Sequence, residues 1–364
     1  MAEYLTNNTD LKKVADAIRT KGGTSAALAY PDEYVSAINA ITTGTELKIV
    51  VSVTSEAVVT ATKGSDTVIG TSVNGVCTLV VPEAGTWSVN ATLNGQTSNT
   101  KSVSIVDSYS LTLSFATSTL NDNEWSVIKT VSDAGEGANY WSIGDRKAVV
   151  LNGTVGALSL SNVTTYAFII GFNHNSSVEG SNRIHFQLAK TALSGGTDIA
   201  FCDFSMNSSS TNSGGWRDSR MRNNICGTSL SSYSGTIIAV IPAELRAVLK
   251  SVTKYTDNTG RGSTTASAIS ATTDYFFLLS EYEVFGTTLY ANDYESSKQK
   301  QYDYYSAGNS KIKYMHSSTS TAVFWLLRSP YAGYSDRFTC ASPDGRINGS
   351  MADTSAGFAP GFCV

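Results

Sequence analysis

Charged residues are scarce in this chain of 364 residues: Asp, Glu, Lys and Arg make up 15% of it, against about 25% in an average soluble domain. The formal net charge of −4 excludes a basic face as the main attractor for nucleic acid. No window approaches the ~18 uninterrupted apolar residues of a membrane-spanning helix, so we expect no membrane insertion. The first residues also lack the basic and apolar regions of a signal peptide, and we expect synthesis in the cytoplasm without signal-dependent export.

Cysteine and histidine are rare as well, with five Cys and three His residues. The cysteines are odd in number and scattered, which argues against a disulfide framework or a zinc site and favours buried free thiols. The histidines are too dispersed to indicate a metal centre or a catalytic triad, so we expect no cofactor. Ser, Thr, Asn, Gly and Tyr replace charge, and they suit short strands and surfaces that bind through neutral hydrogen bonds and aromatic faces.

The chain is longer than the ~250–300 residues at which a single core stops growing. Its patterning changes twice, which divides it into residues 1–43, 44–115 and 116–364. We predict a multidomain protein with a short N-terminal helical hairpin, an all-β immunoglobulin-like sandwich and an α+β C-terminal domain.

Two apolar stripes predict the helices of residues 1–43. Leu11, Val14 and Ile18 share one helical face, and Pro31 suits the first turn of the second helix. Because isolated helices this short are marginal in water, their stripes need a partner. That partner is either the chain's own next domain, or another copy or another protein.

The same segment resembles a known module. Residues 15–26 and 30–38 are similar to an N-terminal segment of tail and baseplate proteins in phages and prophages of gut Firmicutes. The resemblance implies attachment to phage tail or baseplate proteins through residues 1–43. It also implies a virion location. The apolar stripes of the helices indicate a homo-oligomer, with a trimer favoured by analogy with other tail fibres.

Residues 44–115 alternate apolar and polar side chains in several short strands, separated by turn signals such as Asn74-Gly75 and Asn94-Gly95. This pattern predicts a small immunoglobulin-like sandwich with Trp87 in its core. Residues 85–89 with 94–96 resemble transthyretin-like or carboxypeptidase-regulatory-like modules of phage fibres. No pattern in this part carries chemistry, and we interpret it as a spacer.

Four sequence blocks of residues 116–364 resemble, in order, a bacterial and phage domain of the C-type-lectin superfamily, related to formylglycine-generating-enzyme-like folds. The blocks are residues 140–147, 214–222, 276–286 and 324–330. The resemblance implies a compact α+β body whose antiparallel sheet displays a C-terminal loop surface. From the residues themselves we expect helices at 124–132, 219–224, 242–252 and 293–305.

The C-terminal residues predict a hairpin with strands at 338–341 and 346–348 around a turn at 342–345. The polar side chains that lie between the apolar residues of this segment are expected to face solvent. Tyr and Arg on a rigid scaffold are typical of binding hot spots. An ordinary loop is the alternative, but turns alone do not require Tyr331, Tyr334 and Arg337.

Some members of this superfamily are variable proteins of diversity-generating retroelements, in which adenines near the 3′ end of the gene are mutated. An Asn codon altered in this way encodes Tyr, Ser, Asp, Arg, Cys, Gly, Thr or Ala, whereas Met351 does not fit such an origin. The hypothesis predicts an adenine-rich template repeat near the gene. The ligand-binding residues that it implies are Tyr331, Ala332, Tyr334, Asp336, Arg337, Cys340, Ser342, Ser350, Asp353 and Thr354.

Other chemistries of the superfamily lack their motifs here. Calcium-dependent sugar binding requires paired ligand motifs. We find only one similar stretch, residues 216–218, and it lies in the wrong part of the chain. Cys340 and Cys363 have flanking residues unlike the active site of formylglycine-generating enzymes. Neither calcium binding nor thiol oxidation is therefore expected.

Glycoside hydrolysis needs two facing carboxylates. Glu281 and Glu283 share one face of an expected strand, and we interpret them as a buried hydrogen bond or salt bridge. We expect two further groups of residues to hold the fold: His174 with His185, and Trp325 with Arg328.

Together these observations predict a non-enzymatic receptor-binding protein of a phage tail or baseplate that recognises a bacterial surface protein or glycan. Two alternatives stay open, namely a prophage-encoded wall hydrolase and a bacterial surface adhesin. The site prediction requires five side chains to be accessible on one side of the C-terminal domain: Tyr331, Tyr334, Asp336, Arg337 and Asp353.

Overall fold

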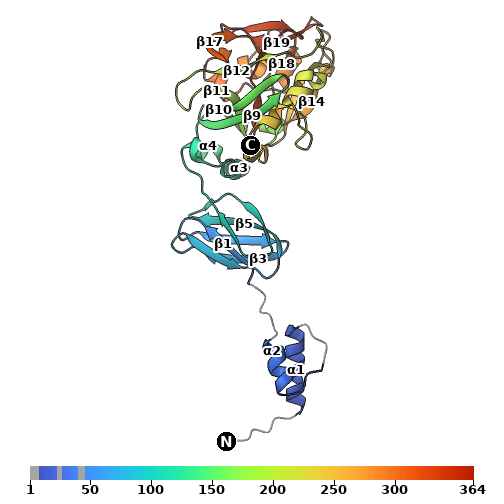
Figure 1. The fold of residues 1–364 in the computed structure, drawn as a ribbon. Helices are drawn as coiled ribbons and strands as arrows, with labels where there is room; N and C mark the ends of the chain where they lie inside the picture. The colour runs from blue at the N-terminus through green and yellow to red at the C-terminus, as the bar shows by residue number, and fades with distance from the viewer. Residues whose placement is uncertain (1–7, 23–26, 40–45) are drawn as a thin grey trace. The chain divides into compact units, whose positions relative to one another are not determined.

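The computed structural model describes residues 8–22, 27–39 and 46–364 (Figure 1). They form a multidomain, β-rich protein whose residues group into two compact units. The N-terminal unit takes in residues 1–93 and 101–113, and the C-terminal unit takes in 94–100 and 114–364. No helix in the described ranges is long and apolar enough to cross a membrane.

The predicted helical hairpin consists of α1 (Asn8–Gly22) and α2 (Asp32–Asn39). Ala15, Ile18 and Tyr34 are buried between the helices, and the Tyr34 hydroxyl donates to the Leu11 carbonyl at 2.6 Å. The rest of the apolar stripes is exposed at Val14, Val35 and Ile38. Ile41, the last residue of the second stripe, lies outside the described residues.

Two sheets follow, and we call them the two-sheet domain. Their strands belong to the N-terminal unit except β6, whose residues fall in the C-terminal unit. One has the order β4-β1-β8, and the other has the order β3-β2-β5-β6 with β7 also paired to β5. Alternate side chains such as Ile49, Val51 and Trp87 are buried, as expected for sheets packed face to face. The strands are β1 (Lys48–Ser52), β2 (Val58–Lys63), β3 (Asp66–Thr71), β4 (Val76–Val80), β5 (Gly85–Leu93), β6 (Gln96–Thr97), β7 (Lys101–Ile105) and β8 (Tyr109–Thr112).

The C-terminal unit contains three sheets with short helices packed on them (Figure 1). Their strand orders are β15-β22-β11-β10-β9, β17-β16-β12-β21-β18-β19-β20 and β13-β14. The strands are β9 (Arg146–Val155), β10 (Leu158–Phe172), β11 (Ile184–Lys190), β12 (Ile199–Phe204), β13 (Val252–Asp257), β14 (Ile269–Asp274), β15 (Phe276–Phe277), β16 (Lys313–Met315), β17 (Ser318–Val323), β18 (Trp325–Pro330), β19 (Arg337–Ala341), β20 (Ile347–Met351), β21 (Ala356–Phe358) and β22 (Gly361–Cys363).

The core of this unit lies around strands β11, β18 and β22, in which every residue is buried. The last strand, β22, lies between β11 and β15 and pairs with both. Trp325 and Arg328 are fully buried in β18, as the sequence predicted. All five cysteines are buried free thiols, which is also as predicted.

The helices of the C-terminal unit are shorter than the sequence indicates. α3 matches the prediction at 124–132, but the expected helix at 242–252 is a single turn and the one at 293–305 breaks into two turns. The helices are α3 (Trp125–Asp133), α4 (Gly137–Tyr140), α5 (Ser176–Glu179), α6 (Gly215–Asp218), α7 (Ile237–Val240), α8 (Ala243–Arg246), α9 (Glu281–Phe285) and α10 (Asp303–Ser306), with 3-10 turns at η1 (Leu120–Asp122), η3 (Ala266–Ala268) and η4 (Asp293–Ser297) and a π-helix at η2 (Met221–Cys226).

The expected strand around Glu281 and Glu283 is wrong, because these residues form helix α9. The Ser280 hydroxyl accepts the backbone N–H of Glu283 at 3.0 Å, and the Glu283 carboxylate accepts the N–H of Ser280 at 3.0 Å. This is a capping box, and its Ser-x-x-Glu spacing is a helix-start signal. By contrast, the predicted C-terminal hairpin is confirmed as β19 and β20.

Trp87→Ala is expected to lower the free energy of unfolding of the two-sheet domain by about 3–5 kcal/mol, because it opens a cavity in the core. Calorimetry of the full chain measures this as a shift of one unfolding transition, with the transition of the C-terminal unit unmoved. Val106→Ala is the matched control, since Val106 is 87% exposed. Equal shifts of both transitions would contradict independent folding of the two units.

Candidate ligand-binding surface

Aromatic side chains gather where the chain leaves β18 and enters β19. The ring of Tyr331 stacks on Tyr290, with ring centres 4.7 Å apart and 17° between the planes. Tyr334 meets Tyr331 edge-on at 5.0 Å, and the Arg337 guanidinium lies 5.0 Å from the centre of the Tyr334 ring. We call Tyr290, Tyr331, Tyr334 and Arg337 the Tyr–Arg cluster. Rings and guanidinium in such contact restrain one another.

Buried Asn212 holds the backbone of this cluster. Its side-chain amide donates to the carbonyl oxygens of Tyr334 at 2.7 Å and Arg337 at 2.8 Å. Its side-chain oxygen accepts the backbone N–H of Arg261 at 2.7 Å. One buried amide therefore joins the 331–337 loop to the loop around Arg261, and a site supported in this way is held rigidly.

Glu281 supports the Tyr290 side of the cluster. Its carboxylate is buried and accepts the backbone N–H groups of Leu289, Tyr290 at 2.9 Å and Ala291 at 3.0 Å. Burial raises the pKa of Glu281, while the three N–H bonds oppose this shift. The predicted role of Glu281 as a buried hydrogen-bond acceptor is thus correct, although the predicted strand is not.

Gly349 in β20 makes room for the Tyr331 ring. A Cβ atom on Gly349 would lie 2.6 Å from two ring carbons of Tyr331. Arg337 pairs with Met351 and Thr339 pairs with Gly349 across the hairpin, so these four residues share one face. Met351 is 43% exposed on that face. It was not among the predicted site residues, because Met does not fit an Asn-codon origin.

Seven of the ten predicted residues meet at one end of the hairpin. The N–H of Ala352 donates to the Asp336 carbonyl at 2.8 Å, which brings the turn after β20 next to the 331–337 loop. Tyr334, Asp353 and Thr354 are exposed, and the other four are half-buried. The seven residues are Tyr331, Ala332, Tyr334, Asp336, Arg337, Asp353 and Thr354.

The other three predicted residues do not join them. Cys340 is fully buried, and burial raises the pKa of its thiol to about 12, so it cannot contact a ligand. Ser342 is buried at the opposite end of the hairpin, where its hydroxyl bonds Asp344 and the backbone of Arg346. Ser350 pairs with Phe338, which places it on the face of β20 opposite the cluster.

Three residues that the sequence did not single out complete this site: Tyr290, Gly349 and Asn212. Glu281 was expected to be a buried hydrogen-bonding residue, but its support of the Tyr290 loop was not predicted. Asn212 and Tyr290 lie far from the C-terminal hairpin in the chain, and no local pattern marks them. A local signal exists only for Glu281: the Ser-x-x-Glu motif at the start of α9 predicts the helix that carries it.

The core of the C-terminal unit contains a buried polar network around Lys254 and Glu283. The Lys254 ammonium donates to Glu179 at 2.6 Å, to Glu283 at 2.9 Å and to the Tyr302 hydroxyl at 2.8 Å. The Arg328 guanidinium bonds both oxygens of Glu283, one of them at 2.8 Å. Burial disfavours ionised Glu283, but Arg328 and Lys254 outweigh it and hold the pKa of Glu283 well below its usual range.

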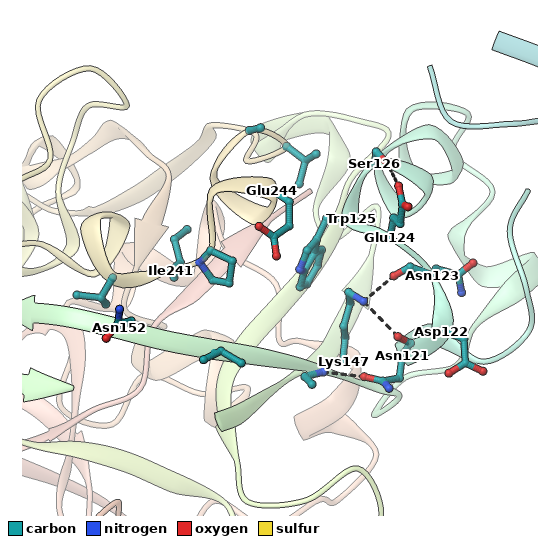
Figure 2. A pocket seen from close by; sticks show the side chains of 16 residues that line it. Asn121, Asp122, Asn123, Glu124, Trp125, Ser126, Lys147, Asn152, Ile241 and Glu244 are labelled. Carbon is teal, nitrogen blue, oxygen red and sulfur yellow. Dashed lines mark hydrogen bonds between the residues drawn. The ribbon is translucent and has the colours of Figure 1, made fainter. Parts of the chain in front are cut away.

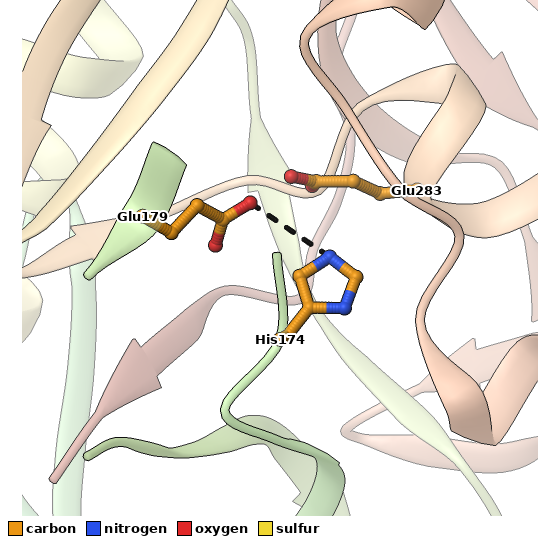
Figure 3. A group of neighbouring side chains, drawn as sticks. All are labelled: His174, Glu179 and Glu283. Atoms are coloured by element: carbon orange, nitrogen blue, oxygen red, sulfur yellow. Dashed lines mark ion pairs between the residues drawn. The ribbon is translucent and has the colours of Figure 1, made fainter. Parts of the chain in front are cut away.

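Figure 3 shows His174, Glu179 and Glu283 pointing toward one another, with ligand atoms within 4.8 Å. Burial lowers the pKa of His174 to about 3, so its imidazole is neutral and could ligate a metal. However, the Lys254 ammonium already bonds both carboxylates, and Arg328 adds a second positive charge at Glu283. The network is thus a charge-balanced fold element, as expected for His174 and His185.

A groove of about 910 Å³ lies elsewhere in the C-terminal unit, with Trp125 and Lys147 among its lining side chains (Figure 2). The Lys147 ammonium donates to the backbone carbonyls of Asn121 at 3.2 Å and Asn123 at 2.5 Å. Its charge is therefore engaged by the protein itself. None of the ten predicted residues lines this groove.

Residues 196–364 match a family described as a domain of unknown function, DUF6273. The match includes the Tyr–Arg cluster, Asn212, Glu281 and the hairpin β19–β20, and it leaves out the N-terminal unit. No curated protein matches the chain.

Zinc is expected to leave the thermal stability of the wild-type protein unchanged, because the Lys254 ammonium occupies the position between the carboxylates that a metal cation would take. Thermal unfolding with equimolar Zn²⁺ and with EDTA should give midpoints that agree within about 1 °C. In Lys254→Met the Glu179 carboxylate loses its ammonium partner while Arg328 still bonds Glu283, and Zn²⁺ is expected to raise the midpoint. Stabilisation of the wild type by zinc and its reversal by EDTA would contradict the assignment.

Glu295→Gln is expected to change how stability depends on pH. Burial raises the pKa of Glu295 to about 7, above the ~4.5 of an unfolded chain, so between these values the folded state binds a proton that the unfolded state lacks. Wild-type stability therefore gains as pH falls through 7, and the variant lacks that gain. Urea unfolding measures the free energy of unfolding of both proteins. Between pH 8 and pH 5 that of the wild type should rise by about 1–3 kcal/mol relative to that of Glu295→Gln.

The control for this measurement is Glu244→Gln, which makes the same substitution at an exposed carboxylate. A difference between Glu295→Gln and wild type that is constant from pH 5 to pH 8 would refute the raised pKa of Glu295.

Proposed function

We propose that this chain is a receptor-binding protein of a phage tail or baseplate, and that it recognises a bacterial surface ligand through the Tyr–Arg cluster and the adjoining turn at 351–354. The observation that carries the proposal is the cluster itself. Two Tyr side chains and one Arg reach solvent from a backbone that buried Asn212 and Glu281 hold. Rigid aromatic and guanidinium groups provide contact area at low entropy cost.

The architecture supports the resemblance that the sequence carries. In the proposal the two-sheet domain is an immunoglobulin-like spacer and the C-terminal unit is C-type-lectin-like. Consistent with a lectin-type body, a mixed set of sheets and short helices ends in a hairpin and a last strand, β22, inside a sheet. Phe338 and Phe358, apolar residues of the C-terminal segment that carries the predicted site, are fully buried.

The proposal includes diversification by a retroelement. Seven of the ten residues reachable from an Asn codon meet at one end of the hairpin, as a diversified surface requires. The exceptions are Cys340, Ser342 and Ser350. The first two are small residues that a buried position accepts, and Ser350 lies on the other face of β20. The decisive observation is a template repeat beside the gene that differs from its 3′ end at adenines.

Attachment and assembly are assigned to residues 1–43. The helices leave Val14, Val35 and Ile38 about half exposed, so apolar surface remains for tail or baseplate proteins or for another copy. A homo-oligomer, with a trimer favoured, would add avidity to weak single contacts.

The alternative of a wall hydrolase finds less support. Its best candidate carboxylates, Glu281 and Glu283, are fully buried and bonded to backbone N–H groups, Arg328 and Lys254. In that state they cannot protonate a glycosidic bond or activate water at one. A surface adhesin would use the same Tyr–Arg cluster and differ in its location.

The test is binding of the labelled full chain to a panel of bacterial strains, including gut Firmicutes. Changing Tyr331, Tyr334 and Arg337 together to Ala is expected to weaken binding about 100-fold or more, because it removes three hot-spot side chains. The matched control changes Tyr30, Tyr109 and Arg346 to Ala, all exposed elsewhere. Unchanged binding by the first variant, or release of saccharide from purified walls, would contradict the proposal.

A further inference from the structure

Apolar side chains flank the Tyr–Arg cluster on segments that the proposed function does not yet use. Leu289 directly precedes Tyr290 and is 62% exposed, and Met351 is paired with Arg337. We infer that the ligand of the cluster is a protein surface and not a glycan, and that Leu289 is one of its anchors. This inference rests on the proposed function and deepens it.

One face of Tyr331 and one face of Tyr334 are already in contact within the cluster. Tyr290 covers one face of Tyr331, and Gly349 packs against two of its ring carbons. The Arg337 guanidinium lies over the ring of Tyr334. Sugar-binding aromatic residues typically offer an open face to the C–H groups of a pyranose ring. The cluster combines partly covered rings with hydroxyls and a guanidinium, a mixture that suits the contacts of a protein interface.

Exposed aliphatic groups point to the same class of ligand. Leu289 lies on a loop whose backbone Glu281 fixes by three hydrogen bonds, so its exposed side chain projects from a rigid base. A leucine side chain gains most from an apolar hollow in its partner, which protein surfaces provide more often than hydroxyl-rich glycans. Met351 adds a flexible apolar side chain of the kind found at adaptable protein interfaces.

The charges around the cluster are mixed in sign. Arg261 is exposed next to the loop at 333, where the N–H of Gly333 donates to the Gly262 carbonyl at 3.1 Å. Asp336 lies 3.5 Å from the Arg337 guanidinium, and Asp353 is exposed on the adjoining turn. Both signs within one patch match the alternating charges of a folded protein, whereas an anionic wall polymer would favour a uniformly basic surface.

The experiment uses the labelled full chain and a strain that binds it. Cells are left untreated, digested with proteinase K, or oxidised with periodate. We expect proteinase K to reduce binding more than 10-fold and periodate to leave it within 2-fold. Leu289→Ser is expected to weaken binding to untreated cells about 10-fold, and its control is Ile69→Ser, because Ile69 is 63% exposed in the two-sheet domain.

Binding that survives proteinase K, binding that periodate abolishes, or an unchanged Leu289→Ser variant would overturn the inference while leaving receptor binding intact. Loss of binding in Ile69→Ser would overturn the assignment of Leu289, because the effect would not be local. If the wild-type chain bound no untreated strain, the proposed function would fail and this inference with it.

Discussion

The C-terminal unit depends on the buried polar network around Glu283. Glu283 comes from α9, Lys254 from β13 and Arg328 from β18, so one carboxylate ties three elements together. All three side chains are fully buried. Removing either cation would leave buried Glu179 and Glu283 with one positive charge in place of two, and an uncompensated buried charge is among the costliest changes in a core.

Helix α9 connects this network to the proposed binding surface. Glu283 faces inward to Arg328 and Lys254, and Glu281, two residues earlier, holds the loop of Tyr290. Strand β18 continues from Arg328 directly into the loop of Tyr331. Because Glu281 and Asn212 bond backbone atoms, the side chains above them can vary without loss of the loop conformation, as the diversification hypothesis requires.

Much of the local structure was predictable, since its causes are local. The β19–β20 hairpin follows from a turn signal between alternating segments, and the burial of Trp87 follows from the period of two. Predictions failed where distant contacts decide. The strand expected at Glu281 is a helix, and the expected helix at 242–252 stops after Arg246. Short segments of ambiguous period take the conformation that the surrounding core imposes.

The sequence by itself determined the β-rich class, the core role of Arg328 and seven of the residues that meet at the end of the β19–β20 hairpin. Only the tertiary structure decided that Tyr290 stacks on Tyr331, that Gly349 makes room for that ring and that Cys340 faces inward. The physical reason is separation along the chain. A pattern of periods and turns reports which face a residue shows, whereas packing between segments far apart decides which residue it meets.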